Sequence, residues 1–142
     1  MRFYSYSNFY LSPIQIGIQA FHCLGEMIIK YGAHKETEQA HLLNDWIQNH
    51  KTLICLNGGN NASLIELHTL LTRVDNPGYP VVKFHEDEES MGGMLTTVGI
   101  VLPAKIYEAV PIDEVACELT YDGLTPWEIE VLQKIKRMPL AR

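Results

Sequence analysis

The chain has 142 residues, 46% of them hydrophobic and 20% charged, a composition that fits one globular domain with a sizeable core and excludes a disordered protein. The net charge of −6 argues against broad binding to a nucleic-acid backbone, which needs clustered lysine and arginine, but it is compatible with a local basic pocket. Cys23, Cys55 and Cys117 lie far apart without CxxC spacing, so we expect reduced thiols in a cytoplasmic protein rather than a disulfide framework or a zinc site. No apolar run is long enough to span a membrane, and residues 1–7 lack the apolar segment of a signal peptide.

Strands and helices are expected to alternate along most of the chain. Ser12 is a suitable N-cap, Pro13 suits the first helical position, and Gly32 is a plausible stop for the helix between them. Residues 51–57 are apolar without alternation, which predicts a strand buried on both faces. In chain order, the patterns predict a strand over 3–11, helices over 13–31 and 36–49, a strand over 51–57, a helix over 62–74, and strands over 79–84 and 95–102.

This alternation predicts an α/β fold, a mixed four-stranded sheet with helices on both faces and the first helix packed across it. Because residues 53–56 and 98–102 are apolar throughout, the strands over 51–57 and 95–102 are expected in the centre of the sheet. The α/β domain is expected to occupy residues 1–103.

Residues 104–142 differ in character and are expected to form a C-terminal extension. In it, Thr125-Pro126-Trp127-Glu128 is a capping box that predicts a helix over 126–137. The apolar side of that helix needs a partner, either the core of the domain or a second subunit, so we expect a homodimer formed partly through it. The residues on this side include Trp127, Ile129, Leu132 and Ile135.

Three polar side chains gather near the start of the helix over 13–31. Gln15 stands three residues after Ser12, the spacing of a capping box, while Gln19 and His22 follow on the same face of the helix. With the N–H groups of the helix N-terminus, this ridge suits an anionic or carbonyl-rich ligand. In the alternative interpretation, Gln15 only caps the helix and His22 is an ordinary core histidine. Four residues surround His22 at core spacing: Ile18, Phe21, Gly25 and Ile28.

A second polar cluster, His85-Glu86-Asp87-Glu88-Glu89-Ser90, follows the strand over 79–84 and runs into Gly92-Gly93. A run of four acids is usually a solvated loop. However, glycines permit an unusual turn or the close approach of a ligand, and loops beyond the strand ends of open α/β sheets commonly bind ligands. Both interpretations stay open from these residues alone.

Several segments together resemble a known family of hydrolases. Ile14-Gln15-Ile16-Gly17-Ile18-Gln19-Ala20-Phe21-His22 is similar to a Gly-Lys-x-x-x-Gln-x-x-His motif, and Trp46 with Lys51-Thr52-Leu53-Ile54 is similar to a Trp and then a Lys entering a strand. His85-Glu86-Asp87-Glu88 with Ser90 occupies the place of a Gln-Asp-Ala-Gly loop and a later Thr, and Thr97-Val98-Gly99-Ile100-Val101-Leu102-Pro103 resembles a final Thr-Val-x-x-Ile-Gly-Pro strand. Over about residues 3–103, the chain therefore resembles the type-2 (archaeal and eukaryotic) peptidyl-tRNA hydrolases.

The chain differs from this family at the residues that match the family's active site. Gln15 stands where the family has a lysine, Glu86 where it has an aspartate, and Ser90 where it has a threonine. A glutamine cannot supply the positive charge of a lysine, and the loss of an electrostatic stabiliser commonly slows a reaction about 100- to 1,000-fold. The chain also lacks the overall basic charge that would hold a tRNA, so hydrolysis is expected to be weak or absent.

The resemblance implies a pocket shaped for the 3′-terminal adenosine of a tRNA. We therefore expect a protein with little or no catalytic activity that binds or sequesters an adenosine-containing nucleotide, for instance a phage protein that removes a nucleotide defence signal in the cytoplasm of its host. The expected ligand-binding residues are Gln15, Gln19, His22, Glu86, Ser90 and Thr97.

Two other functions stay open. In an active peptidyl-tRNA hydrolase, Glu86 would orient water while Gln15 and Ser90 replaced the lost donors. In a protein-interaction module, the extra C-terminal helix would bind a partner. We expect no cofactor and no metal site, because the remaining histidines are scattered over different elements without metal-ligand spacing. These histidines are His34, His41, His50 and His68.

Overall fold

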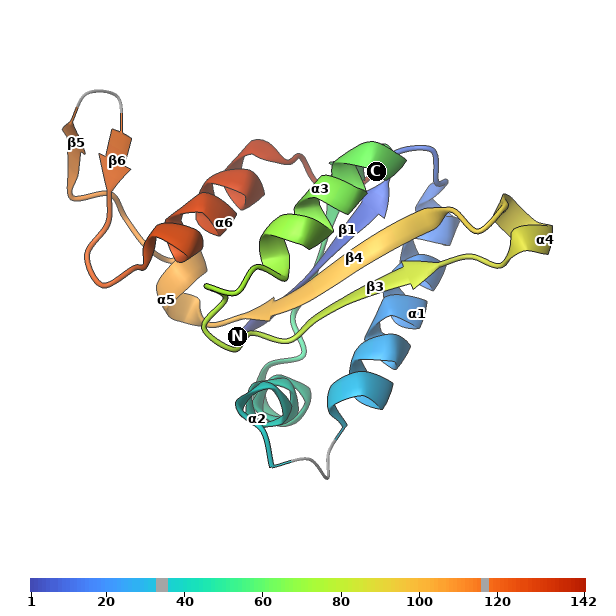
Figure 1. The fold of residues 1–142 in the computed structure, drawn as a ribbon, viewed down its shortest axis with the longest axis horizontal. Helices are drawn as coiled ribbons and strands as arrows, with labels where there is room; N and C mark the ends of the chain where they lie inside the picture. Colours follow the sequence, from blue (N-terminus) through green and yellow to red (C-terminus); the bar gives the residue numbers. More distant parts are fainter. Residues whose placement is uncertain (33–35, 116–117) are drawn as a thin grey trace.

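A four-stranded mixed sheet lies between two layers of helices in the computed structural model (Figure 1). The structure describes residues 1–32, 36–115 and 118–142, so His34 and Cys117 lie outside the described residues. In chain order, the elements are β1 (Arg2–Asn8), α1 (Pro13–Tyr31), α2 (Glu38–Asp45), the π-helical turn η1 (Trp46–His50), β2 (Leu53–Gly59), α3 (Asn61–Leu71), β3 (Val81–His85), α4 (Glu88–Met91), β4 (Leu95–Leu102), α5 (Ala104–Tyr107), β5 (Asp113–Val115), β6 (Glu118–Thr120) and α6 (Pro126–Arg137). None of the described helices is long and apolar enough to cross a membrane.

The α/β class and the mixed four-stranded sheet are confirmed, but the predicted strand order is partly wrong. The order is β2-β1-β4-β3, with β1 parallel to β2 and antiparallel to β4, and β3 antiparallel to β4. The strand predicted over 51–57 is therefore an edge strand, and the side chain of Leu53 is 42% exposed. The C-terminal residues cover its outer edge, because Asn57 N–H donates to Pro139 O at 2.9 Å and Ala141 N–H donates to Cys55 O at 3.0 Å. An apolar run does not distinguish a central strand from an edge strand that another segment covers.

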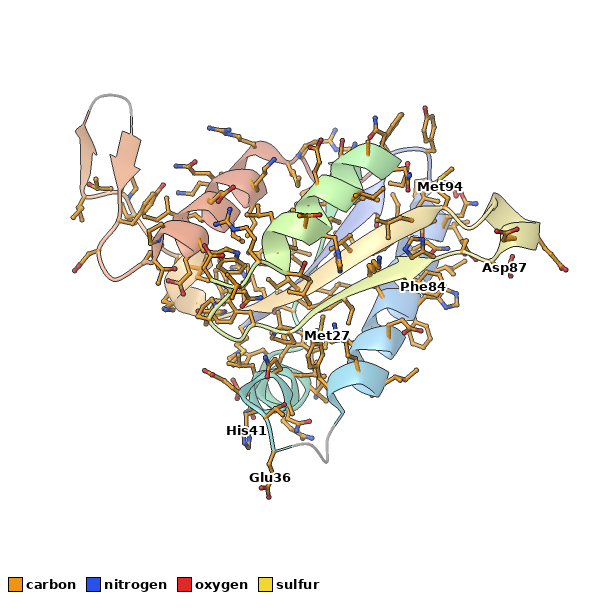
Figure 2. All side chains as sticks on the ribbon, in the orientation of Figure 1. Met27, Glu36, His41, Phe84, Asp87 and Met94 are labelled. Atoms are coloured by element: carbon orange, nitrogen blue, oxygen red, sulfur yellow. The ribbon has the colours of Figure 1, made fainter. Side chains whose placement is uncertain are left out.

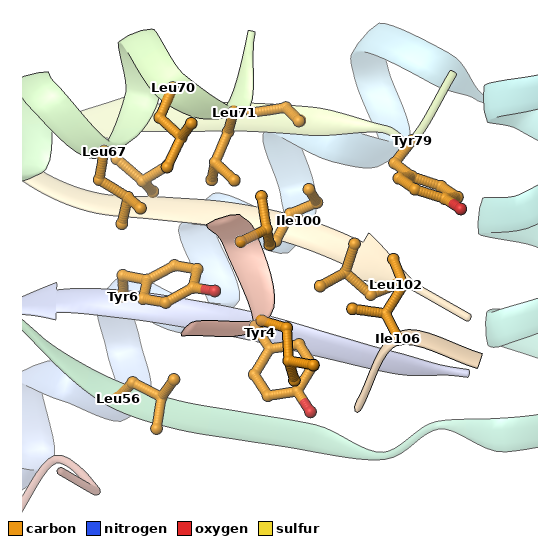
Figure 3. Close-up of a cluster of buried hydrophobic side chains, with 14 of the residues drawn as sticks. Tyr4, Tyr6, Leu56, Leu67, Leu70, Leu71, Tyr79, Ile100, Leu102 and Ile106 are labelled. Carbon is orange, nitrogen blue, oxygen red and sulfur yellow. The ribbon is translucent and has the colours of Figure 1, made fainter. Parts of the chain in front are cut away.

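The strand over 95–102, β4, is central as predicted, and the other central strand is β1, whose aromatic and serine residues alternate between two buried faces. Tyr4 and Tyr6 lie in the larger apolar cluster, which α3 and α6 cover (Figure 3). Phe3 lies in the second cluster with Cys23 of α1 and Trp46 of η1. Because side chains alternate along a strand, Ser5 and Ser7 share the α1-facing side with Phe3. Aromatic and serine residues therefore alternate in β1 because its two faces contact different helices, and not because one face is exposed to solvent.

The ends of two helices agree with local sequence signals. At the start of α1, Ser12 and Gln15 form the predicted capping box, and Gly32 ends the helix with a φ of 32°. The predicted bounds and capping box of α6 are confirmed. The helix predicted over 36–49 instead begins at Glu38, after the N-cap Thr37, and closes with the π-helical turn η1. The short elements α4, α5, β5 and β6 have no counterpart among the predicted ones.

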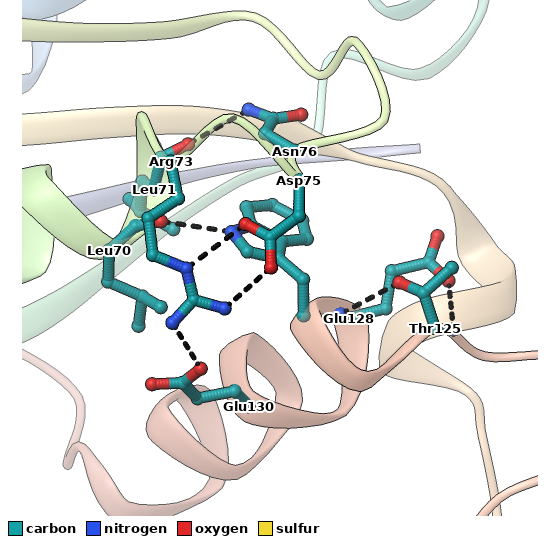
Figure 4. Close-up of polar contacts among 9 residues, drawn as sticks. Leu70, Leu71, Arg73, Asp75, Asn76, Thr125, Glu128 and Glu130 are labelled. Carbon is teal, nitrogen blue, oxygen red and sulfur yellow. Dashed lines mark hydrogen bonds and ion pairs between the residues drawn. The ribbon is translucent and has the colours of Figure 1, made fainter.

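The C-terminal helix packs on the same core as the rest of the chain. Trp127 and Leu132 of α6 are buried in the larger cluster, and Trp127 Nε1–H donates to Leu70 O at 2.9 Å. On the surface, Arg73 joins Asp75 to Glu130 of α6 (Figure 4). Since the apolar side of α6 finds its partner within the chain, it supplies no argument for a dimer through this helix.

Glu128 fixes α6 in place from inside the domain. Its fully buried carboxylate accepts a hydrogen bond from Thr125 N–H at 2.8 Å (Figure 4). It also accepts a hydrogen bond from Tyr79 Oη–H at 2.5 Å and lies 2.7 Å from Lys105 Nζ. Burial opposes ionisation, but the hydrogen bonds from Lys105, Tyr79 and Thr125 together hold the pKa of Glu128 below its ordinary value.

We expect Glu128→Ala to lower the free energy of unfolding at pH 7 by about 3 kcal/mol, because it leaves Tyr79 and Lys105 without their acceptor. Chemical denaturation measures this. A folded-state pKa below the ordinary value near 4.5 means that the stabilisation is complete above that pH and is lost as the pH falls through the folded-state pKa, so the difference from the wild type should shrink in acid. The control Glu130→Ala removes an exposed ion pair and should cost less than about 1 kcal/mol. Equal losses in the two variants would contradict the role of Glu128.

Candidate functional site

Polar and aromatic contacts join α1 to the edge strand β3 along a line that we call the α1–β3 boundary. At one end, Gln19 of α1 contacts Glu86, which directly follows β3. In the middle, the ring of His22 stacks on Phe84. At the other end, Tyr31 Oη–H donates to Val81 O at 2.9 Å. Residue numbers rise along α1 as they fall along β3, so the two elements run antiparallel.

A directed chain of hydrogen bonds orients Glu86. The side chain of Gln19 is only 3% exposed. Thr96 Oγ1–H donates to Gln19 Oε1 at 2.7 Å, and Gln19 Nε2–H donates to a carboxylate oxygen of Glu86. Because a carboxylate can accept about four hydrogen bonds, Glu86 keeps acceptor capacity for a ligand. Glu86 is half-buried, so its remaining acceptor positions lie at the end of the hydrogen-bond chain that is nearest the protein surface.

A register shift between β3 and β4 brings Thr96 to Gln19. Phe84 pairs with Thr97 but the next residue, His85, pairs with Leu95, so Thr96 is the extra residue of a β-bulge. The bulge turns Thr96 toward α1 next to Thr97, whereas a regular strand would point the two side chains to opposite faces. The β-bulge therefore places the Thr96 hydroxyl where it can hydrogen-bond Gln19.

His22 and Phe84 form an aromatic platform beside this carboxylate. Their ring centroids are 4.7 Å apart and their planes differ by 8°. Figure 2 shows Phe84, Asp87 and Met94 near the end of the sheet that leads into α4. His22 is exposed, so the interpretation of it as a core histidine is wrong. The exposed ring gives the boundary a flat surface on which a planar ligand can stack.

The expected core stripe of α1 is also wrong. Ile18, Phe21 and Ile28 are exposed, and the buried residues of the helix lie on another face. That buried face consists of Ile16, Gln19, Ala20, Cys23 and Met27. Both stripes are apolar at helical spacing, so periodicity does not tell which one meets the sheet.

Gln15 does not join the cluster around Glu86. Its Oε1 accepts a hydrogen bond from Ser12 N–H at 2.9 Å, and its own N–H donates to Ser12 Oγ at 3.4 Å. The capping interpretation of Gln15 is therefore confirmed. Thr97 is fully buried on the α1-facing side of β4, and the side chain of Ser90 lies outside the described part of the structure.

Unpaired hydroxyl groups mark the sheet beneath α1. Ser5, Ser7 and Thr97 are buried on this side, and in the described part of the chain their hydroxyls have no hydrogen-bond partner. Buried polar groups are nearly always hydrogen-bonded. Among the described residues, the buried hydroxyl of Tyr6 on the opposite side of the sheet is unpaired as well. Sequence reasoning missed Thr96, Phe84 and these serines. The available signals were the Thr96-Thr97 pair at a strand end and the serines of a strand with no solvated face.

The acidic segment after β3 forms a hydrogen-bonded turn, and its side chains Asp87, Glu88 and Glu89 are exposed. Glu86 N–H donates to Met94 O at 3.1 Å, and a helical turn, α4, occupies residues 88–91. Gly92 and Gly93 have φ values of 62° and 67°, which glycine adopts without strain. The predicted unusual turn is therefore confirmed, and it returns the chain to β4 next to Glu86.

A basic cavity of about 230 Å³ lies at the far end of the boundary. Lys30 and Lys83 contribute its positive charge, while Glu26, His68 and Val82 complete the lining. Burial, followed by the charges of Lys83 and Lys30, lowers the pKa of His68. This cavity is a local basic site in a chain whose net charge is negative.

No family model and no curated protein sequence matches the chain. In residues 1–32, 36–115 and 118–142, no three His, Cys, Asp or Glu side chains are grouped so as to hold a metal ion.

Two adjacent threonines allow a matched test of the hydrogen bond between Thr96 and Gln19. Thr96→Val removes the donor to Gln19 and should lower the free energy of unfolding by about 1–2 kcal/mol. Thr97→Val replaces an unpaired hydroxyl with a methyl group of the same size, so stability should stay constant or rise by about 1 kcal/mol. Denaturant unfolding measures both values. Equal effects at the two positions would contradict the hydrogen-bond assignment.

Proposed function

We propose that the chain binds a small adenosine-containing nucleotide along the α1–β3 boundary, in a fold related to the type-2 peptidyl-tRNA hydrolases. The observation that carries this proposal is the carboxylate of Glu86, which Gln19 orients beside the exposed face of the stacked His22 and Phe84 rings. An oriented acceptor next to a flat aromatic surface matches the two recognition needs of a nucleobase, hydrogen bonding at its edge and stacking on its face.

The purine would stack on His22 and donate its exocyclic amine to Glu86. Stacking of a base on an aromatic side chain contributes about 1–3 kcal/mol. A carboxylate is acceptor-only when ionised, so Glu86 favours a donor such as the adenine amine or a ribose hydroxyl. The chain Thr96–Gln19–Glu86 holds the acceptor in place before the ligand arrives, which reduces the entropic cost of binding.

The phosphate groups would occupy the basic cavity at Lys30 and Lys83. At a rise of 1.5 Å per residue, Gln19 and Glu26 of α1 are about 10 Å apart along the helix, a span comparable to that between the amine and the phosphate of an adenosine nucleotide. Lysine binds phosphate as a point charge. Lys83 is exposed at this cavity, while Lys30 Nζ also donates to Val81 O at 3.1 Å.

Titration calorimetry against adenosine and a panel of mono-, di- and cyclic adenine nucleotides tests the proposal. Glu86→Gln keeps the size of the side chain but removes its charge, and it should weaken binding about 10- to 100-fold, equivalent to about 1.4–2.8 kcal/mol. The control Glu89→Gln removes an exposed charge of the same loop and should leave affinity unchanged. Absence of binding to every compound would refute the nucleotide proposal.

The phosphate arm has its own comparison. Lys83→Ala should weaken binding of the nucleotides but not of adenosine, because only the nucleotides carry a phosphate. Lys134→Ala, on the exposed side of α6, removes the same charge elsewhere and serves as the control. If Lys83→Ala weakened the binding of adenosine and of its nucleotides equally, the cavity would not be the phosphate site.

Peptidyl-tRNA hydrolysis is the second candidate, because Glu86 is held close to Gln19 and retains an acid at this point of the boundary. We expect hydrolysis to be weak or absent, since the Gln15 side chain caps α1 and brings no positive charge. Release of peptide from peptidyl-tRNA at a rate on the order of 10 per second would contradict a binding function. Gln15→Lys should raise any residual rate, whereas Gln48→Lys, an exposed change of equal charge, should not.

A further inference from the structure

The outward face of α1 carries a continuous stripe of exposed apolar side chains. Ile14 is 77% exposed, Ile18 48%, Phe21 73% and Ile28 44%. With Gly25 between the last two, these positions follow one another at intervals of four, three, four and three residues, the spacing of a coiled-coil interface. We call these five residues the outward stripe.

A helix side that faces water normally carries charged residues. In the 19 residues of α1 only Glu26 and Lys30 are charged, whereas the 12 residues of α6 include five charged side chains. Together with the neighbouring Ile29, which is also exposed, the stripe amounts to roughly 600 Å² of exposed surface, at the upper end of the largest apolar patch on a typical monomer. The stripe is therefore suited to contact with another apolar surface.

We propose that a second copy of this chain covers the stripe, with the two α1 helices packed antiparallel about a two-fold axis at Phe21. A two-fold interface uses the same surface of both copies, so the surface must be complementary to itself. Ile14 and Ile28 each lie seven residues from Phe21. In an antiparallel pair, Ile14 of one copy therefore meets Ile28 of the other. Phe21 then meets Phe21 at the axis.

Gly25 provides the space that this arrangement needs. Ile18 precedes Phe21 by three residues and Gly25 follows it by four, so Ile18 of one copy lies within about 1.5 Å, along the helix axis, of the level of Gly25 of the other. A Cβ atom placed on Gly25 would meet nothing within 4 Å, so the bulky Ile18 side chain finds open space there. The stripe thus pairs large with small at one level and matches equal residues at the others.

The area of the stripe favours a second copy, and its lack of charge limits the repulsion between two copies at this surface. The net charge of −6 makes two copies repel one another through most of their surfaces, but the stripe itself contains no charged residue. Complete burial of about 600 Å² on each copy would give an interface of at most roughly 1,200 Å², the lower limit for a specific, stable complex. A lipid surface fits less well, because helices that lie on membranes carry lysine and arginine along their polar side and α1 has only Lys30 there.

Disulfide cross-linking tests the geometry. The variants are made with Cys55→Ser and Cys117→Ser, while the buried Cys23 is kept. Phe21→Cys should form covalent dimers with itself, and Ile14→Cys should cross-link with Ile28→Cys but not with itself. Ile65→Cys, a half-exposed position on α3, is the control and should form no covalent dimer when reducing agent is absent.

Light scattering over a concentration series tests the association itself. The wild type should have the mass of a dimer, Phe21→Glu that of a monomer, and Ile65→Glu that of the wild type. Circular dichroism checks that Phe21→Glu is folded. A wild type that stays monomeric while Phe21→Cys fails to cross-link would overturn the proposal, and self-linking of Ile14→Cys would overturn its antiparallel arrangement. Phe21-dependent binding of the monomer to neutral lipid vesicles would replace the second copy with a membrane. None of these results depends on nucleotide binding, so the two proposals can fail separately.

Discussion

The close approach of α1 to the sheet at Gly99 sets the position of everything else on that face. A Cβ atom at Gly99 would lie 2.7 Å from Cys23 Sγ and 2.8 Å from Phe3 Cζ, distances that van der Waals repulsion forbids. Glycine in the central strand β4 therefore allows Cys23 to seat the middle of the helix directly on the strand. Once that contact is made, the rotation of α1 about its own axis is no longer free.

The polar contacts of the α1–β3 boundary follow from this rotation. With Cys23 facing β4, Gln19 lies one turn earlier on the same buried side and reaches Thr96 and Glu86. An amide in a buried position must satisfy both its donor and its acceptor, and the β-bulge at Thr96 supplies the one partner that a regular strand would have turned away. The result is an acidic side chain with a defined orientation at the rim of the sheet.

The same rotation turns Ile18 and Phe21 away from the sheet. One helix thus presents three different surfaces: a core side around Cys23, a polar and aromatic side at the boundary, and an apolar side that no other part of the described chain covers. Stability alone would favour charged residues on the outward side and apolar residues beneath the helix. The outward side instead carries isoleucines, and the mainly apolar side beneath the helix also contains the unpaired hydroxyls of Ser5 and Ser7. Such departures from the most stable arrangement are expected where a surface serves binding.

Local interactions determined which segments become helices and where these begin. Ser12 with Gln15, and Thr125 with Glu128, lie three residues apart, so their capping boxes form within one turn and can be predicted from the sequence. The contacts of the site join residues 67 and 77 positions apart, and no local pattern specifies them. The sequence did not determine which apolar side of α1 meets the sheet, nor that β2 lies at the edge. Hydrophobic periodicity identifies the apolar sides of an element but does not show which segment covers them. Tertiary packing decided both, through the missing side chain of Gly99 and the pairing of the C-terminal residues with β2.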